Sequence, residues 1–181
     1  MTEPVIQGWC PGALRPMLSG DGLVVRVRPR AGRLEPAQAK GIARLARAHG
    51  NGLIDLSARA NVQLRGVTEA SHPALIDGLR DLGLIDANAE AEARRNIIVT
   101  PYWTKSCATL PVVAALSHAL GTTNAPALPG KFGFAVDLGT RPVLRAISAD
   151  IRIETGSDGS QQVALLCIGD HPFGRAVAAT N

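Results

Sequence analysis

Four polar side chains occur at every second position of the stretch ARANVQLRG, namely Arg59, Asn61, Gln63 and Arg65. In a β-strand, side chains two positions apart project from the same face. A guanidinium group presents a planar fork of donors that matches a carboxylate or another oxyanion. The stretch therefore predicts a strand face that binds an anion. Charged residues that protect a sheet edge against aggregation are the alternative interpretation.

A second stretch, GLVVRVR (22–28), shows the same alternation. Arg26 and Arg28 would project from one face of this strand, and the valines between them from the other. Sheets that bind single-stranded RNA normally offer exposed aromatic side chains on which bases stack. Neither this strand nor the stretch 60–67 contains Phe, Tyr or Trp, so no nucleic-acid partner is expected.

The composition favours a globular chain with an anionic ligand. Of the 181 residues, 46% are hydrophobic, and no apolar run approaches the roughly 20 residues of a membrane span. Residues 22–65 contain nine basic and two acidic side chains, a net +7, whereas the whole chain carries +4. The N-terminus lacks the pattern of a signal peptide, so we expect a cytoplasmic protein without a membrane partner.

Familiar catalytic and metal-binding patterns do not occur in the sequence. It has no GxGxxG, phosphate-binding loop, HExxH or nucleophile elbow. Cys10, Cys107 and Cys167 are far apart and form no CxxC pair. We therefore expect no disulfide framework and no metal site built from this chain alone.

The elements that must position these side chains follow from periodicity and turn residues. We expect helices over 35–50, 71–84 and 110–121. We expect strands over 22–28, 52–57, 60–67, 96–101, 131–138, 143–155 and 161–169, the last two as a hairpin. Residues 1–21 are expected to be irregular, 86–95 to be a polar connection, and the end of the chain to start another helix. This order predicts a β-α-β-α unit followed by a helix and antiparallel strands, an α+β fold with two sub-domains.

Four segments in this order resemble the sirohaem-containing nitrite and sulfite reductases: GLVVRVRPRAGRL, SARANVQLRG, ARRNIIVTP and LPGKF. Within that superfamily, DGLVVRVRP, NVQLRGV and KFGFAVD are most similar to the precorrin-3B synthase branch. The resemblance implies an α+β fold, with a ferredoxin-like half-domain over 10–85. A partial α+β domain of the nitrite/sulfite reductase type would follow over 95–181.

The resemblance also implies roles for individual residues. The positions that match residues facing the substrate side of the haem, and thus the predicted catalytic residues, are Arg26, Arg95 and Lys131. The predicted cofactor-binding residues are Arg59 and Gln63, which match residues that hold the macrocycle, with Arg65 and Asn96 as neighbours. Sirohaem and precorrins are polycarboxylates, so a wall rich in positive charge and hydrogen-bond donors suits either one.

Some positions depart from the family pattern. The TTRQ motif is replaced by Ser57-Ala58-Arg59-Ala60, and Gly133 stands where a second lysine occurs. Both changes lower the density of donors and charge that sulfite or nitrite reduction needs, which favours the precorrin branch. The family implies sirohaem and a [4Fe-4S] cluster, but the cluster cysteines have no counterpart among the three cysteines of this chain.

The sequence therefore predicts part of an oxidoreductase of aerobic cobalamin biosynthesis, similar to precorrin-3B synthase, which hydroxylates precorrin-3A with O2. We expect an N-terminal half that is inactive alone, with a tetrapyrrole as ligand and a second copy or a complementing C-terminal half as partner. One alternative is a fragment of a sirohaem-dependent nitrite or sulfite reductase. Another is a non-enzymatic module that binds tetrapyrrole or RNA.

Overall fold

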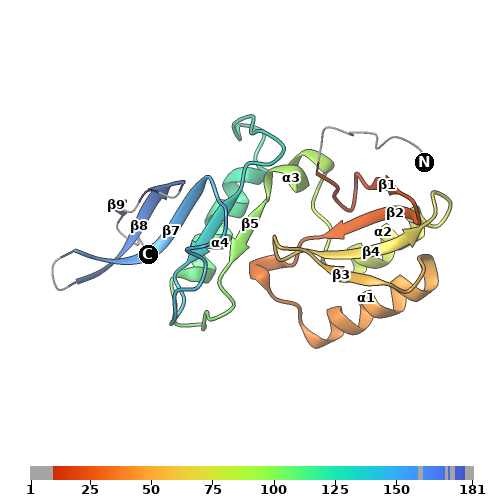
Figure 1. Cartoon of the computed structure of the whole chain (residues 1–181), viewed down its shortest axis with the longest axis horizontal. Helices are drawn as coiled ribbons and strands as arrows, with labels where there is room; N and C mark the ends of the chain where they lie inside the picture. The colour runs from red at the N-terminus through yellow and green to blue at the C-terminus, as the bar shows by residue number, and fades with distance from the viewer. Residues whose placement is uncertain (1–9, 159–160, 170, 172–173, 178–181) are drawn as a thin grey trace. The chain divides into compact units, whose positions relative to one another are not determined.

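The computed structural model describes residues 10–158, 161–169, 171 and 174–177, and these form two compact units (Figure 1). Unit 1 contains the chain up to Pro29 together with Leu34–Ala93. Unit 2 contains Arg30–Arg33 and the chain from Arg94 onward. Each unit combines a sheet with helices, which confirms the predicted α+β class. No helix in the described ranges is long and apolar enough to cross a membrane.

Unit 1 is built on a four-stranded antiparallel sheet with strand order β1-β2-β4-β3. The strands are β1 (Met17–Ser19), β2 (Gly22–Val27), β3 (Ile54–Leu56) and β4 (Val62–Val67). The helices are α1 (Pro36–His49), α2 (His72–Asp81) and the short α3 (Ala89–Arg94). Strand β2 lies beside β4, so the two arginine-bearing stretches of the sequence are neighbours in the sheet.

The core of unit 1 lies between its sheet and helices α1 and α2. Val25 and Val27 of β2 and Leu64 of β4 are fully buried there, packed with apolar residues of both helices. The predicted helix over 35–50 is confirmed, and Ile42 and Ala46 form the buried side of α1. Alternation along β2 and β4 sends the valine and leucine side chains into this core. The polar side chains between them, including Arg26, Gln63 and Arg65, are only half-buried.

One close approach fixes the end of α1 against the sheet. The helix ends at Gly50, whose N–H donates to the carbonyl of Ala46 (3.1 Å). A Cβ atom at Gly50 would lie 2.4 Å from the backbone oxygen of Arg65, so only glycine fits without movement of β4. Asn51 N–H then donates to that same oxygen (3.0 Å). The turn after α1 is thereby hydrogen-bonded to the central strand.

Unit 2 is built on a five-stranded mixed sheet with strand order β5-β6-β7-β8-β9. Strands β5, β6 and β7 are parallel to one another, and β8 and β9 continue the sheet antiparallel. The strands are β5 (Ile97–Val99), β6 (Phe134–Asp137), β7 (Ile151–Asp158), β8 (Gln161–Ile168) and β9 (Arg175–Val177), and the long helix is α4 (Thr109–Gly121). The predicted hairpin of β7 and β8 is confirmed.

Both faces of the unit 2 sheet are covered at its centre. On one face, Val99, Val136 and Leu138 pack with residues of α4. On the other face, Ile98 and Ala135 pack with apolar residues of the loop after β6, including Leu144. All four residues of β6 are consequently buried, as expected for a parallel strand covered on two sides.

A four-residue segment between β2 and α1 belongs to unit 2. It includes the short 3-10 turn η1 (Arg30–Gly32). The carbonyl of Ala31 accepts a hydrogen bond from the Trp103 indole N–H (2.9 Å), and Arg33 stacks over the Trp103 ring at 3.8 Å. Arg33 also donates to the carbonyls of Pro101 and Trp103. The chain therefore leaves unit 1 after Pro29, contributes to unit 2, and returns.

Several expected elements differ from the structure. Strand β1 lies within the stretch expected to be irregular, and α3 lies within the expected polar connection 86–95. The strand expected over 143–155 begins only at Ile151, because residues 143–149 form the loop that covers the sheet. The described part of the C-terminal stretch contains strand β9 instead of a helix. The antiparallel arrangement expected for the strands after the helix is wrong for β6 and β7, which run parallel to each other.

Candidate functional site

Arg26 and Gln63 face each other across strands β2 and β4. They are direct partners in the register of the two strands. The Arg26 guanidinium donates from Nε (3.2 Å) and Nη2 (2.7 Å) to the amide oxygen of Gln63. Because both donors converge on one acceptor, the guanidinium plane is fixed against the strand. Gln63 therefore orients Arg26, which is one of the predicted catalytic residues.

Arg59 does not lie on strand β4, contrary to the alternation seen in the sequence. It lies in the five-residue loop 57–61 that joins β3 to β4. Ala60 has a positive φ of 55°, which breaks the extended conformation before β4 begins at Val62. The Asn61 N–H donates to the Ser57 hydroxyl (3.2 Å), and the Asn61 residue is buried. The expected face of four polar residues is thus reduced to Gln63 and Arg65, with Arg59 presented by the loop.

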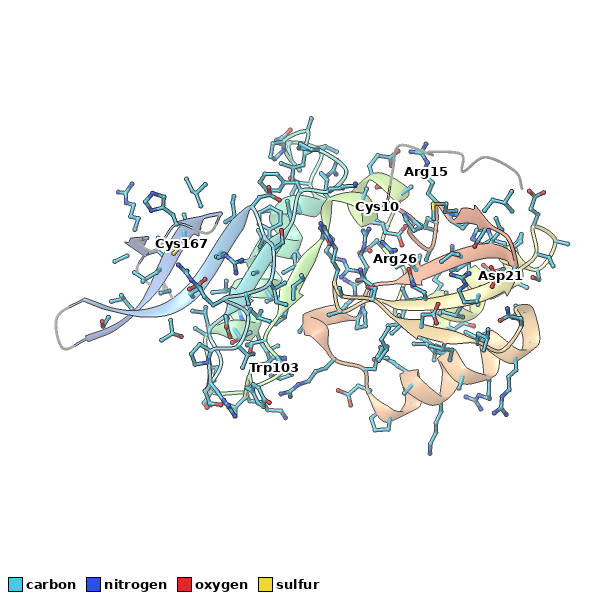
Figure 2. The ribbon with its side chains drawn as sticks, viewed as in Figure 1. Cys10, Arg15, Asp21, Arg26, Trp103 and Cys167 are labelled. Atoms are coloured by element: carbon cyan, nitrogen blue, oxygen red, sulfur yellow. The ribbon has the colours of Figure 1, made fainter. Side chains whose placement is uncertain are left out.

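The positive charge of the loop residue Arg59 nevertheless acts on Arg26. Burial lowers the pKa of Arg26, and the positive charge of Arg59 lowers it further, while the Cys10 side chain acts in the opposite direction through charge and a hydrogen bond. Figure 2 labels Cys10 on the loop before β1 and Arg26 on β2. Both guanidinium groups are half-buried, and their like charges repel each other within unit 1. Such a pair is stabilised when an anion lies between them.

Arg65 makes a different set of contacts at the other end of β4. It forms a two-point pair with Asp21, through Nη2 to Oδ1 (2.8 Å) and Nε to Oδ2 (3.1 Å), and its Nη1 lies 3.7 Å from Asp55. The hydrogen bond from Arg65 lowers the pKa of Asp21, and Asp21 raises the pKa of Arg65. The side-chain contacts of Arg65 that the structure shows are therefore with residues of unit 1 itself, the two carboxylates and the Ser19 hydroxyl (3.2 Å). Its predicted role toward a cofactor stays a prediction.

The remaining predicted residues belong to unit 2. Arg95 and Asn96 are buried at the start of β5, and Lys131 is exposed in the turn before β6. The Asn96 side-chain amide donates to the carbonyl of Phe132 (3.0 Å), and its backbone oxygen accepts from Phe134 N–H (2.9 Å). Asn96 therefore ties the Lys131 turn to β5. Whether Arg95 and Lys131 share a pocket with Arg26 stays a prediction.

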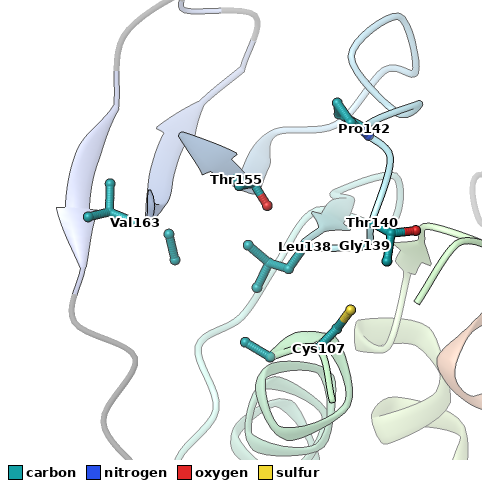
Figure 3. Close-up of a pocket in the computed structure, with 9 residues that line it drawn as sticks. Cys107, Leu138, Gly139, Thr140, Pro142, Thr155 and Val163 are labelled. Atoms are coloured by element: carbon teal, nitrogen blue, oxygen red, sulfur yellow. The ribbon is translucent and has the colours of Figure 1, made fainter. Parts of the chain in front are cut away.

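Unit 2 also contains a cavity of about 570 Å³ that the sequence did not indicate. Figure 3 shows Cys107 at the start of α4, with Leu138 and Thr155 among the other lining residues. The Thr104 hydroxyl lies 3.2 Å from the Cys107 sulfur, and hydrogen bonding to Thr104 lowers the pKa of the Cys107 thiol. The surroundings of Cys107 therefore favour its thiolate form.

Three residues with defined contacts at the unit 1 site were not predicted from the sequence: Cys10, Asp21 and Glu92. Asp21 and Cys10 lie far from their arginine partners in the sequence, so no local pattern connects them. Glu92 lies in a stretch that reads as polar and solvent-exposed, but its side chain is buried. Across the residues that the structure describes, no group of three or more His, Cys, Asp or Glu side chains is placed to hold a metal ion.

Comparison with known families identifies the class of unit 1. Residues 15–82 match the family model of the nitrite/sulfite reductase ferredoxin-like half domain. This range begins before β1 and ends just after α2, so it contains the complete sheet and both core helices of unit 1. Unit 1 is thus similar to a nitrite/sulfite reductase ferredoxin-like half domain, and the α+β region of unit 2 follows it.

The chain is also a homologue of a precorrin-3B synthase from Sinorhizobium sp. The two are 34% identical over 165 residues, which is 90% of this chain and 36% of the relative. The chain thus spans about a third of the length of its relative. The structure of the Mycobacterium tuberculosis NirA protein matches with a TM-score of 0.64 and 20% identity, over 98% of this chain and 34% of that one. The NirA likeness shows the fold alone.

Proposed function

We propose that this chain supplies part of the tetrapyrrole site of a precorrin-3B synthase-like oxidoreductase of aerobic cobalamin biosynthesis. In this proposal the guanidinium groups of Arg26 and Arg59 bind carboxylate groups of the macrocycle, and Gln63 keeps Arg26 in position. The family resemblance adds Arg95, Asn96 and Lys131 of unit 2 to the residues proposed to bind the macrocycle. The whole protein would hydroxylate precorrin-3A with O2.

The observation that carries the proposal is the fixed orientation of the Arg26 guanidinium, on which the charge of Arg59 also acts. Their positive charges interact within unit 1, and the Arg26 guanidinium is fixed by two hydrogen bonds to Gln63. Planar donors held in this way match carboxylates, which are abundant on precorrins and on sirohaem. The donor set therefore fits such a macrocycle. Sirohaem and a [4Fe-4S] cluster, where the whole protein binds them, would supply electron transfer.

Two observations favour this function over the alternatives. The identity of 34% to precorrin-3B synthase extends over 90% of the chain, whereas the NirA likeness is one of fold. The sheet strands β2 and β4 carry no aromatic side chain, so the face lacks the stacking platform of a typical single-strand RNA-binding sheet. A fragment of a sulfite or nitrite reductase stays the second candidate, because the half-domain model covers both activities.

The test uses uroporphyrin, a polycarboxylate tetrapyrrole, titrated into the 181-residue chain and followed by absorbance. Arg59→Ala should weaken binding about 10- to 100-fold, which corresponds to the roughly 1.5–3 kcal/mol of a hydrogen bond to a charged group. The matched control is Arg44→Ala, which removes one exposed arginine of α1 and leaves the site intact. Far-UV circular dichroism should be the same for all three chains.

Equal binding by wild type and Arg59→Ala would overturn the proposal, as would the same loss in Arg44→Ala. Absence of uroporphyrin binding by the wild-type chain would also count against it. The domain limits 10–85 and 95–181, the cytoplasmic location, and completion of the site by a second copy or another chain stay predictions. Sedimentation of the chain with and without uroporphyrin measures whether a second copy is recruited.

A further inference from the structure

Residues Cys10–Leu14, which we call the strap, run beside strand β2 in unit 1. The Arg26 backbone N–H donates to the carbonyl of Gly12 (3.0 Å), so the strap is hydrogen-bonded at the position of the predicted catalytic arginine. Pro11, Gly12 and Ala13 are buried. At the start of the strap, the Cys10 side chain interacts with the Arg26 guanidinium. The strap therefore contacts both the backbone and the side chain of Arg26.

The strap is held in place by one buried carboxylate. Glu92 on α3 is 3% exposed, and its Oε1 accepts from Ala13 N–H (2.7 Å) while its Oε2 accepts from Leu14 N–H (3.0 Å). The fit is close, because a Cβ atom at Gly12 would lie 2.2 Å from Oε2 of Glu92. His72 Nε2 lies 2.9 Å from the carbonyl of Ala13 and adds a further contact.

Opposing effects act on the pKa of the buried Glu92 carboxylate. Burial raises the pKa of Glu92, and the negative charge of Asp86 acts in the same direction. The two N–H donors of the strap and the positive charge of Arg28 act in the opposite direction. A buried carboxylate depends on its hydrogen bonds, so opening the strap costs those two bonds and exposes Glu92. One side chain that lies apart from Arg26 and Arg59 thus accepts two of the hydrogen bonds that hold the strap.

We propose that the strap is a gate on the Arg26–Arg59 anion site and that Glu92 is its latch. With the strap closed, Cys10 occupies one side of the Arg26 guanidinium. With the strap displaced, that side becomes open to an anion. The kind of anion that the gate admits rests on the proposed function. The movement of the strap can be measured without any ligand.

The experiment measures the alkylation of Cys10 by iodoacetamide, a neutral reagent, in the full 181-residue chain, with each cysteine resolved by peptide mass spectrometry. Glu92→Gln keeps the side-chain volume but replaces one acceptor oxygen with an amide that cannot accept a hydrogen bond. It should increase the rate at Cys10 about tenfold, the effect of losing one buried hydrogen bond. The control Glu90→Gln changes the exposed glutamate of the same helix and should leave the rate unchanged.

Two further measurements separate opening of the strap from unfolding. Hydrogen exchange of the β4 amides should stay protected in Glu92→Gln, while exchange at Ala13 and Leu14 becomes faster. The association rate of uroporphyrin should increase in the same variant. An unchanged alkylation rate at Cys10, or an equal loss of protection in β4, would overturn the latch. Faster alkylation with an unchanged uroporphyrin association rate would overturn the gate.

Discussion

The guanidinium group of Arg26 donates two hydrogen bonds to a single atom, the amide oxygen of Gln63, across neighbouring antiparallel strands. The amide oxygen of Gln63 holds the guanidinium group in one orientation. Because the amide is uncharged, it does not neutralise the arginine. A carboxylate at position 63 would instead neutralise the arginine and repel an anionic ligand. Glutamine at position 63 therefore suits the proposed binding of an anion by Arg26.

This relationship gives the first prediction. Gln63→Leu removes the acceptor, so the Arg26 side chain loses its fixed orientation and uroporphyrin binding should weaken about tenfold. Gln63→Glu should weaken it more, because the new carboxylate pairs with Arg26. Titration of uroporphyrin into both variants at equal ionic strength measures which of them binds more weakly. Stronger binding by Gln63→Glu than by Gln63→Leu would show that Arg26 does not act through its charge.

The pair of Asp21 and Arg65 predicts a dependence of stability on pH. Because Arg65 lowers the pKa of Asp21 in the folded chain, the folded state holds this proton less tightly than the unfolded state. The stabilisation is therefore present above the unfolded pKa of about 3.9 and is lost as pH falls through the lower folded value. Asp21→Asn should flatten the acid side of a plot of unfolding midpoint against pH. Asp77→Asn, which removes an exposed partner of Arg80, is the control.

The close approach at Gly50 predicts a specific cost of substitution. A methyl group at this position would meet the backbone oxygen of Arg65, which cannot move without shifting β4. Gly50→Ala should lower the free energy of unfolding by about 1–3 kcal/mol, the usual cost of overpacking. Gly20→Ala is the matched control, because a Cβ atom there has no neighbour within 4 Å. Urea denaturation with equal slopes for both variants measures the difference, and an equal effect of the two would refute the explanation.

The thiol of Cys107 should react at lower pH than an ordinary cysteine. The hydrogen bond from Thr104 lowers its pKa, so Thr104→Ala should shift the pH profile of its alkylation toward higher pH. Thr104→Ser keeps a hydroxyl group and should restore the wild-type profile. Cys167, which is 2% exposed, should react far more slowly in every variant. A profile unaffected by Thr104→Ala would assign the reactivity of Cys107 to another cause.

The sequence predicted the elements whose patterns are local. The apolar stripe of α1, the valines of β2 and the hairpin of β7 and β8 follow from periodicity and turn residues, and all three are present. The α+β class and the likeness to precorrin-3B synthase were also predicted correctly. The assignment of individual residues to the site stays a prediction.

Other features depend on contacts that sequence patterns do not contain. Arg59 was expected on a strand because its neighbours alternate, but the positive φ of Ala60 turns the chain before β4 begins. The stretch 86–95 was expected to be a polar connection, and its short run of alternating Ala and Glu gives no sign that Glu92 is buried. Its environment is created by the strap, nearly eighty residues earlier in the sequence. Local propensity cannot predict a partner at that separation.

The segment Arg30–Arg33 affects how the gene can recombine. Since these four residues belong to unit 2 while the chain on either side belongs to unit 1, neither unit corresponds to one uninterrupted stretch of gene. A recombination event that exchanged codons 94–181 alone would pair a foreign Trp103 with the resident Ala31 and Arg33. Shuffling of this half domain as an exchangeable cassette is therefore disfavoured, and the two units should have been transmitted and should have diverged together.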